Sequence, residues 1–249
     1  MAEAAKARPA STILLLRDSA GPDGNGEIEV FMMVRHYEID FNSGALVFPG
    51  GAVDPGDHDI AGKPDLYAGG EALDGEALGF RIAAVRETFE ESGILLAKSR
   101  GSTTLVDAKL AGEIEAANRA ALCEGKTTFL KILTDNELLL TLDGLVPYAH
   151  WITPEGMPKR FDTWFFLAAA PPDQVGAHDG KESTDSIWVS PREALAGGES
   201  GRFRRRPAPR AGRPRWNPST PCRRAHRPVP AAPPRERTRC RSVLACPPA

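Results

Sequence analysis

Residues 83–96 read AAVRETFEESGILL, and the pattern of this stretch predicts how the rest of the chain folds around it. A helix turns by about 100° per residue, which here separates an apolar stripe from an acidic one. The apolar stripe predicts a helix anchored in a core. The acidic side chains repel one another by a few tenths of a kcal/mol per pair, so we expect a cation to relieve them. The apolar stripe consists of Leu78, Ile82, Val85 and Phe89, and the acidic stripe of Glu87, Glu90 and Glu91.

The acidic stripe has the chemistry of a metal site. Hard divalent cations prefer oxygen ligands and often bind through carboxylates together with substrate phosphates. Glu87, Glu90 and Glu91 are therefore the candidate ligands of Mg²⁺ or Mn²⁺. We expect Arg86 to orient these glutamates and Gly93 to end the helix. A solvated acidic face with an arginine partner is the alternative that these residues alone leave open.

The second decisive stretch lies upstream, at residues 47–57, VFPGGAVDPGD. It predicts a tight turn in which Gly50 and Gly51 let the backbone approach a ligand closely. Joined to RETFEESGI, this stretch resembles the Nudix box, G-x5-E-x7-R-E-U-x-E-E-x-G-U, where U is a bulky aliphatic residue. Asp57 stands where that pattern has Glu. The spacer also differs, because 28 residues separate Asp57 from Arg86 in place of seven.

A box split in this way is similar to the branch of Nudix hydrolases that includes peroxisomal coenzyme A diphosphatase and its bacterial relatives. The W-I-T-P run from Trp151 and the RFDTWFFL run from Arg160 resemble the same branch, and the stretch after Gly180 resembles the end of a Nudix domain. The resemblance implies an α/β fold, a Nudix α/β/α sandwich with a mixed central sheet. It also implies that Arg35, at a strand end, contacts a substrate phosphate, although a solvated strand end remains an alternative. Glu182 would be a distal metal ligand or base.

Apolar periodicity divides the chain into elements. We expect a Nudix domain over residues 8–200 that contains two insertions. Residues 58–75, rich in Gly, Asp and Pro, are predicted to be a loop that leaves the helix and restarts it near Glu76. Residues from about 105 to 142 are predicted to be a helical insertion. Strands are expected at residues 11–17, 27–35, 145–151 and 160–170.

Charge and composition narrow the function classes. Up to residue 200 the chain carries 17 basic and 32 acidic residues, so this part repels polyanions and is not expected to bind nucleic acid. No apolar run is long enough to span a membrane, and the STILLLR run is too short for a signal peptide. We therefore expect a cytoplasmic protein that binds no membrane. The four cysteines show neither a zinc-site spacing nor a disulfide framework.

Residues 201–249 form a tail of different character. It contains 14 Arg, no Lys and a single acid, Glu236, and Pro is frequent. Such a composition cannot build a core, so the tail is predicted to be disordered. One interpretation is an Arg-rich arm for nucleic acid or anionic membrane. The other is a reading-frame error near Arg204 in a GC-rich gene, which resequencing of the locus would test.

The family resemblance implies a reaction. Nudix enzymes hydrolyse a nucleoside diphosphate linked to a group X, here a small-molecule substrate. The branch suggests coenzyme A or acyl-coenzyme A, cut by water whose proton is accepted by Glu90 or Glu182. The alternatives are a nucleotide-sugar or dinucleotide diphosphatase, and a catalytically inactive Nudix-fold binding module. The sequence does not predict the oligomeric state.

Overall fold

The structure, a computed structural model, describes residues 5–19, 26–35, 45–176 and 183–200. The chain divides into two units, Met1–Arg210 and Ala211–Ala249, and every described residue belongs to the first. The predictions for Glu182 and for the tail 201–249 therefore concern residues outside the described part.

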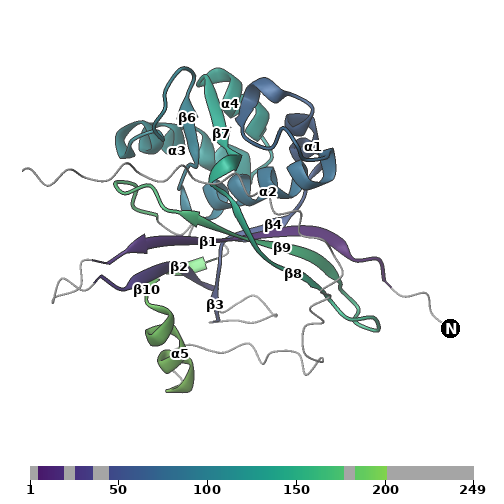
Figure 1. The fold of residues 1–249 in the computed structure, drawn as a ribbon, viewed down its shortest axis with the longest axis vertical. Coiled ribbons are helices and arrows are strands. Elements are labelled where there is room, and N and C mark those ends of the chain that lie inside the picture. Colours follow the sequence, from purple (N-terminus) through teal and green to yellow (C-terminus); the bar gives the residue numbers. More distant parts are fainter. Residues whose placement is uncertain (1–4, 20–25, 36–44, 177–182, 201–249) are drawn as a thin grey trace, which may run out of the picture. The chain divides into compact units, whose positions relative to one another are not determined.

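A seven-stranded mixed sheet forms the centre of the first unit (Figure 1). Its strand order is β10-β2-β1-β9-β8, with β3 pairing to β2 and β4 to β1. The pair β1–β9 is parallel and the other pairs are antiparallel. The strands are β1 (Arg8–Asp18), β2 (Ile28–Arg35), β3 (Leu46–Val47), β4 (Gly50–Ala52), β8 (Val146–Ile152), β9 (Phe161–Ala169) and β10 (Ser183–Val189).

The apolar strands predicted from the sequence occupy the middle of this sheet. β1 and β2 form an antiparallel pair, with Leu16 opposite Val30. β9 lies between β1 and β8, as expected for a strand that is apolar on both faces. β2 is buried on both faces, because Phe31 and Met33 are buried as well as Val30 and Met32.

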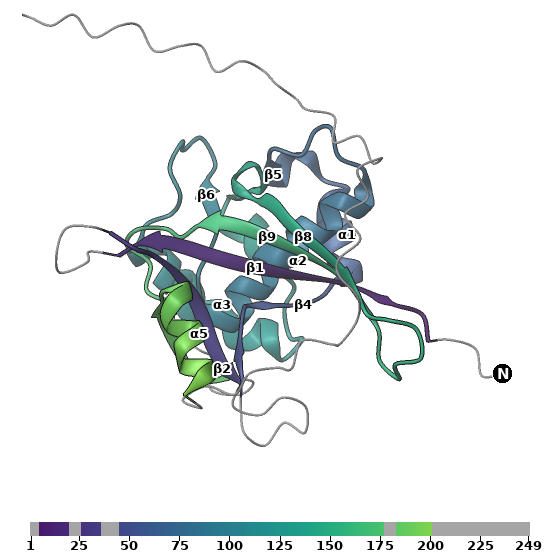
Figure 2. The same cartoon turned by 60° about the horizontal axis from the view of Figure 1, so that its bottom comes forward.

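Helices cover both faces of the sheet, as Figures 1 and 2 show. α2 packs on one face together with α1, α3 and α4, above a core that includes Ile13, Phe89 and Phe166. α5 lies on the other face, over a smaller cluster around Val30 and Met32. The predicted α/β/α sandwich is thus confirmed. The helices are α1 (Pro55–Ala61), α2 (Gly75–Ser92), α3 (Ala108–Cys123), α4 (Phe129–Asp135) and α5 (Pro191–Glu199).

A second, three-stranded sheet lies on the side of α2. It has the order β5-β7-β6 and joins both insertions, because β5 comes from the first and β7 from the second. The segment 105–142 therefore contains α3, α4 and a strand. The remaining elements are the 3-10 turns η1 (Pro64–Leu66) and η2 (Leu142–Gly144) and the strands β5 (Tyr67–Ala68), β6 (Ala97–Ser99) and β7 (Leu138–Thr141).

The prediction that residues 58–75 form a loop is wrong. Helix α1 runs into this segment, and η1 and β5 follow before α2 begins at Gly75. A capping box between Asp54 and Asp57 starts α1, and Pro55 suits its first turn. Ile60 is 1% exposed and Leu66 4%, so both side chains anchor the segment in the core. The expected restart near Glu76 is confirmed.

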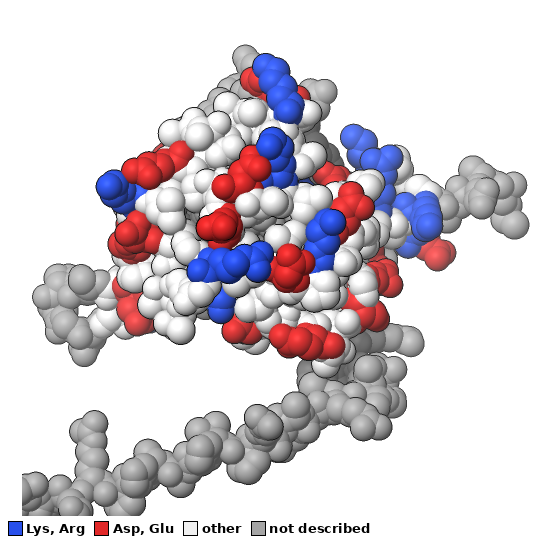
Figure 3. Space-filling view, turned by 90° about the horizontal axis from the view of Figure 1, so that it is seen from above, with Lys and Arg blue, Asp and Glu red and all other residues white. Residues whose placement is uncertain are grey.

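The helical side of the molecule carries charges of both signs. Figure 3 shows acidic and basic side chains interspersed over this face, without a continuous basic stripe among the described residues. Among the described residues there is also no helix long and apolar enough to cross a membrane.

Candidate active site

Helix α2 presents the three candidate glutamates, and both of its ends are fixed. Asp74 caps the start by accepting a hydrogen bond from the Ala77 N–H at 2.8 Å. The helix ends at Gly93, whose φ of 73° is left-handed and whose N–H donates to the Phe89 carbonyl. The apolar stripe, from Leu78 to Phe89, is buried as predicted. Since the helix cannot rotate without exposing that stripe, its opposite face stays directed at the β4 turn.

Arg86 holds the two halves of the split motif together. Its Nε and Nη2 atoms bind the two carboxylate oxygens of Asp57 at 2.8 and 3.0 Å. Nη2 also donates to the Ala52 carbonyl at 2.8 Å, and Nη1 contacts Glu87 at 3.0 Å and Glu90 at 3.2 Å. The side chain is 8% exposed. This fork geometry fits the predicted orienting role of Arg86.

Asp57 shows how a shorter acid serves at the position where the motif has Glu. Its side chain is fully buried and also accepts a hydrogen bond from the Asp54 N–H at 2.8 Å. One carboxylate therefore caps α1 and forms a bidentate pair with Arg86. The 28 intervening residues complete α1, form η1 and β5 and begin α2, so the chain returns to Asp57 at Arg86.

The Gly50–Gly51 turn lies against the glutamates. The Gly50 N–H donates to Oε2 of Glu91 at 2.8 Å. Gly50 has φ of 154°, and a Cβ there would lie 2.2 Å from the Ser11 carbonyl oxygen. A Cβ on Gly51 would lie 2.5 Å from Oε1 of Glu87. Gly50 therefore requires glycine, whereas a side chain at Gly51 would displace the Glu87 carboxylate, and the turn brings backbone to the acidic face.

Burial of the acidic cluster changes its proton affinities. Burial raises the pKa of Glu87 to about 7; the nearby Arg86 charge lowers this pKa, and the Glu90 charge raises it further. Burial also raises the pKa of Glu90, against the lowering effect of Arg86. For Arg86 itself, burial lowers the pKa, but the hydrogen bond to Asp57 and the charges of Glu87, Asp57 and Glu90 raise it overall. Burial thus outweighs the charge of the single arginine, and the pKa values of both glutamates stay raised.

Glu87→Gln is expected to remove a pH dependence from the stability of the metal-free protein. Because the folded pKa of Glu87 lies above its ordinary 4.5, its protonation stabilises the fold below pH 4.5, and this contribution is lost as pH rises through about 7. In chelator, urea unfolding should show the variant more stable than wild type at pH 8 by roughly 1–3 kcal/mol and equal to it at pH 4.5. The exposed Glu113→Gln should change neither value, and a wild-type stability that is flat between these pH values would contradict the expectation.

The donor set fits a hard divalent cation. It comprises three carboxylates within one helical turn, beside a glycine turn whose backbone reaches them. Buried glutamates with a raised pKa are ionised more readily when a cation lies beside them. Among the described residues, no three His, Cys, Asp or Glu side chains are already grouped as a metal site. Arg86 Nη1 instead contacts one oxygen each of Glu87 and Glu90.

Two predicted site residues fall partly or wholly outside the described residues. Arg35 ends β2, where its backbone pairs with Ser183, but its side chain is not described. Glu182 lies outside the described residues. Two tryptophans lie in the β8–β9 hairpin, where Trp164 stacks on His150 at 4.4 Å and Trp151 is 55% exposed.

Sequence reasoning missed the contacts that α3 makes with α2. Arg119 Nε donates to the Glu90 carbonyl at 2.8 Å, and its Nη1 binds Glu115 at 2.7 Å. The thiol of Cys123 approaches the same carbonyl at 3.8 Å. A positive charge near a helix C-terminus is favourable. The spacing of Glu115 and Arg119 by four residues indicated an ion pair, but nothing in it indicated the partner helix.

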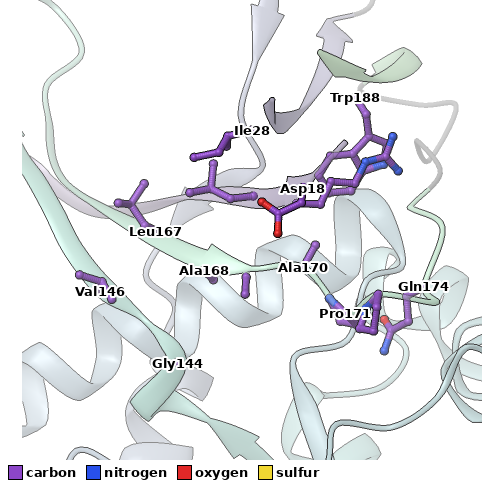
Figure 4. A pocket seen from close by; sticks show the side chains of 14 residues that line it. Asp18, Ile28, Gly144, Val146, Leu167, Ala168, Ala170, Pro171, Gln174 and Trp188 are labelled. Atoms are coloured by element: carbon purple, nitrogen blue, oxygen red, sulfur yellow. The ribbon is translucent and has the colours of Figure 1, made fainter. Parts of the chain in front are cut away.

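A cavity of about 690 Å³ lies at another part of the sheet (Figure 4). The ends of β1 and β9 line it, and Asp18 and Trp188 face it across an apolar floor that includes Leu167. None of the predicted site residues lines this cavity. We place the candidate active site by its chemical groups, at α2 and the β4 turn, although the cavity is larger than the pocket of about 550 Å³ beside Glu90.

Comparison with known proteins identifies the family. The family model of the NUDT19 Nudix domain matches residues 64–203, more than half of the chain. The chain belongs to the Nudix hydrolases. A Nudix hydrolase structure from Alicyclobacillus acidocaldarius is 31% identical, with a TM-score of 0.66, and the match covers 80% of this chain and 85% of that one. The split Nudix box therefore sits on a Nudix fold.

The related curated proteins include a putative nudix hydrolase 7 from Caenorhabditis elegans and several proteins named acyl-coenzyme A diphosphatase NUDT19. The Gallus gallus protein is 29% identical over 240 residues, covering 76% of this chain and 62% of that protein. The Xenopus laevis protein is 26% identical over 211 residues, covering 70% and 55%. The chain thus spans little more than half the length of these Nudix relatives.

Proposed function

We propose that this chain hydrolyses the diphosphate linkage of coenzyme A or acyl-coenzyme A in a reaction that depends on Mg²⁺ or Mn²⁺. The observation that carries the proposal is the contact of Glu87 and Glu91 with the Gly50–Gly51 turn, with Glu90 linked to Glu87 through Arg86. The names of the NUDT19 relatives support the choice of substrate. Water would add across the P–O–P bridge and yield 3′,5′-ADP and 4′-phosphopantetheine.

The side chains divide the work in this proposal. Glu87, Glu90 and Glu91 would hold the divalent cation, which would neutralise the diphosphate and the charge that develops in the transition state. Glu90 or Glu182 would accept the proton of the attacking water. Arg86 would fix the glutamate face through Asp57, and Arg35 would bind a substrate phosphate.

The direct test is incubation of the full chain with Mg²⁺ or Mn²⁺ and a panel of diphosphates, with phosphate-ester products separated by chromatography. Coenzyme A and acetyl-coenzyme A should be cleaved at least tenfold faster than ADP-ribose, a nucleotide sugar and a dinucleotide polyphosphate. Preference for one of the latter would favour the alternative diphosphatase. Metal uptake without turnover of any compound would favour the inactive binding module.

A further inference from the structure

A pocket of about 550 Å³ borders the candidate glutamates on the side of the insertions. The N-terminal end of α1, the Arg86–Glu90 turn of α2 and the corner between α3 and α4 line it, and α1 and α4 lie on the same side of the sheet as α2 (Figure 1). Its volume lies within the range of about 300–1,000 Å³ that is usual for small-molecule sites. A substrate whose diphosphate lies at the glutamates therefore has an adjoining space for one of its two halves.

The charges around this pocket disfavour a phosphorylated occupant. Asp54, Asp59 and Glu90 contribute three carboxylates to the lining. Arg86 is the one basic side chain among the described lining residues, and its donors already bind Asp57, Ala52, Glu87 and Glu90. The adenosine half of coenzyme A carries a 3′-phosphate, which such a rim would repel.

The walls of the pocket favour the pantetheine half of coenzyme A. Leu122, Phe129 and Leu130 give the pocket an apolar side, and the neighbouring Thr127 and Thr128 add hydroxyl groups. The pantetheine arm is uncharged, with a branched aliphatic segment and two amides that suit such a lining. Thr128 also caps α4 by accepting from the Lys131 N–H at 3.2 Å, which leaves Thr127 as the residue to vary without disturbing a helix start.

We propose that the pocket between α1, α2 and the α3–α4 corner binds the pantetheine arm of the substrate, and that Thr127 is a specificity-determining residue. This inference rests on the proposed function, because it assigns one half of coenzyme A to the pocket. The insertions, which form most of the pocket, then select the group X, while the Nudix box binds the diphosphate.

The test titrates the two product halves separately into the Mn²⁺-loaded full chain. Thr127→Trp should weaken binding of 4′-phosphopantetheine at least tenfold and leave 3′,5′-ADP binding within twofold. The indole ring would fill only this pocket, which the adenosine half does not occupy. Thr127→Phe should give a smaller loss. The matched control is Lys126→Trp, whose position is next to Thr127 but absent from the lining and 73% exposed; it should leave both affinities within twofold.

Three results would overturn the inference: wild type that does not bind 4′-phosphopantetheine, a Thr127→Trp variant that binds it normally, and a variant that loses both halves equally. Unchanged Mn²⁺ uptake and unfolding temperature would show that a variant is folded. If Thr127→Trp disturbs the α3–α4 corner, Thr127→Phe, with its smaller side chain, still tests the inference. Failure of the proposed function is a separate observation, since wild type could bind the two halves as described without cleaving coenzyme A.

Discussion

Glu91→Gln is expected to lower metal-dependent hydrolysis of coenzyme A by about a thousandfold, or roughly 4 kcal/mol of transition-state stabilisation. The substitution removes one negative charge from the cation site and replaces one ligand oxygen by an amide nitrogen that cannot coordinate. The fold should survive, because Gln keeps a carbonyl oxygen that can accept the hydrogen bond Gly50 now donates to Glu91. The measurements are steady-state rates with Mg²⁺ and calorimetric uptake of Mn²⁺.

The control for this prediction lies on the same helix. Glu76 is exposed in the first turn of α2, so Glu76→Gln makes the same chemical change far from the last turn. It should retain wild-type turnover and metal uptake. A Glu91→Gln protein with turnover near that of wild type would exclude Glu91 from the cation site, whereas lost turnover with full Mn²⁺ uptake would limit its role to the substrate complex.

The helix and its acidic face could be predicted because their information is local. Leu78, Ile82, Val85 and Phe89 repeat with the helical period, and a helix with that stripe has one way to pack on an apolar sheet. The end of the helix at Gly93 is also a local signal, since glycine adopts a left-handed φ without strain. The central strands followed from apolar runs in a similar way.

The rest of the site depends on contacts between distant residues. Asp57 and Arg86 are 29 positions apart, and no periodicity links them; the family motif supplied the pairing. The segment 58–75 was predicted to be a loop because Gly, Asp and Pro dominate its composition. Two buried side chains, Ile60 and Leu66, outweigh that composition and hold the segment on the core. The pocket beside Glu90 was not predicted, since it exists only where both insertions meet α2.

Arg86→Met is expected to cost about 3–5 kcal/mol of the free energy of unfolding, a large part of the 5–15 kcal/mol typical of a domain. The substitution would leave Asp57 buried without a counter-charge and would also remove the donor shared by Glu87 and Glu90. A buried charge that loses its partner is far more destabilising than a broken surface pair. Urea unfolding in chelator measures the effect without a contribution from bound metal.

The comparison that isolates this cause is Lys131→Met, which breaks an exposed ion pair with Asp135 and should cost less than about 1 kcal/mol. A double variant, Asp57→Asn with Arg86→Met, should be more stable than Arg86→Met alone, because it no longer buries an unpaired carboxylate. If Arg86→Met proved no worse than Lys131→Met, the bidentate pair would not be what joins the two halves of the motif. The apolar stripe of α2, the pairing of β4 with β1 and the hydrogen bond from Gly50 to Glu91 would then hold the glutamate face at the glycine turn.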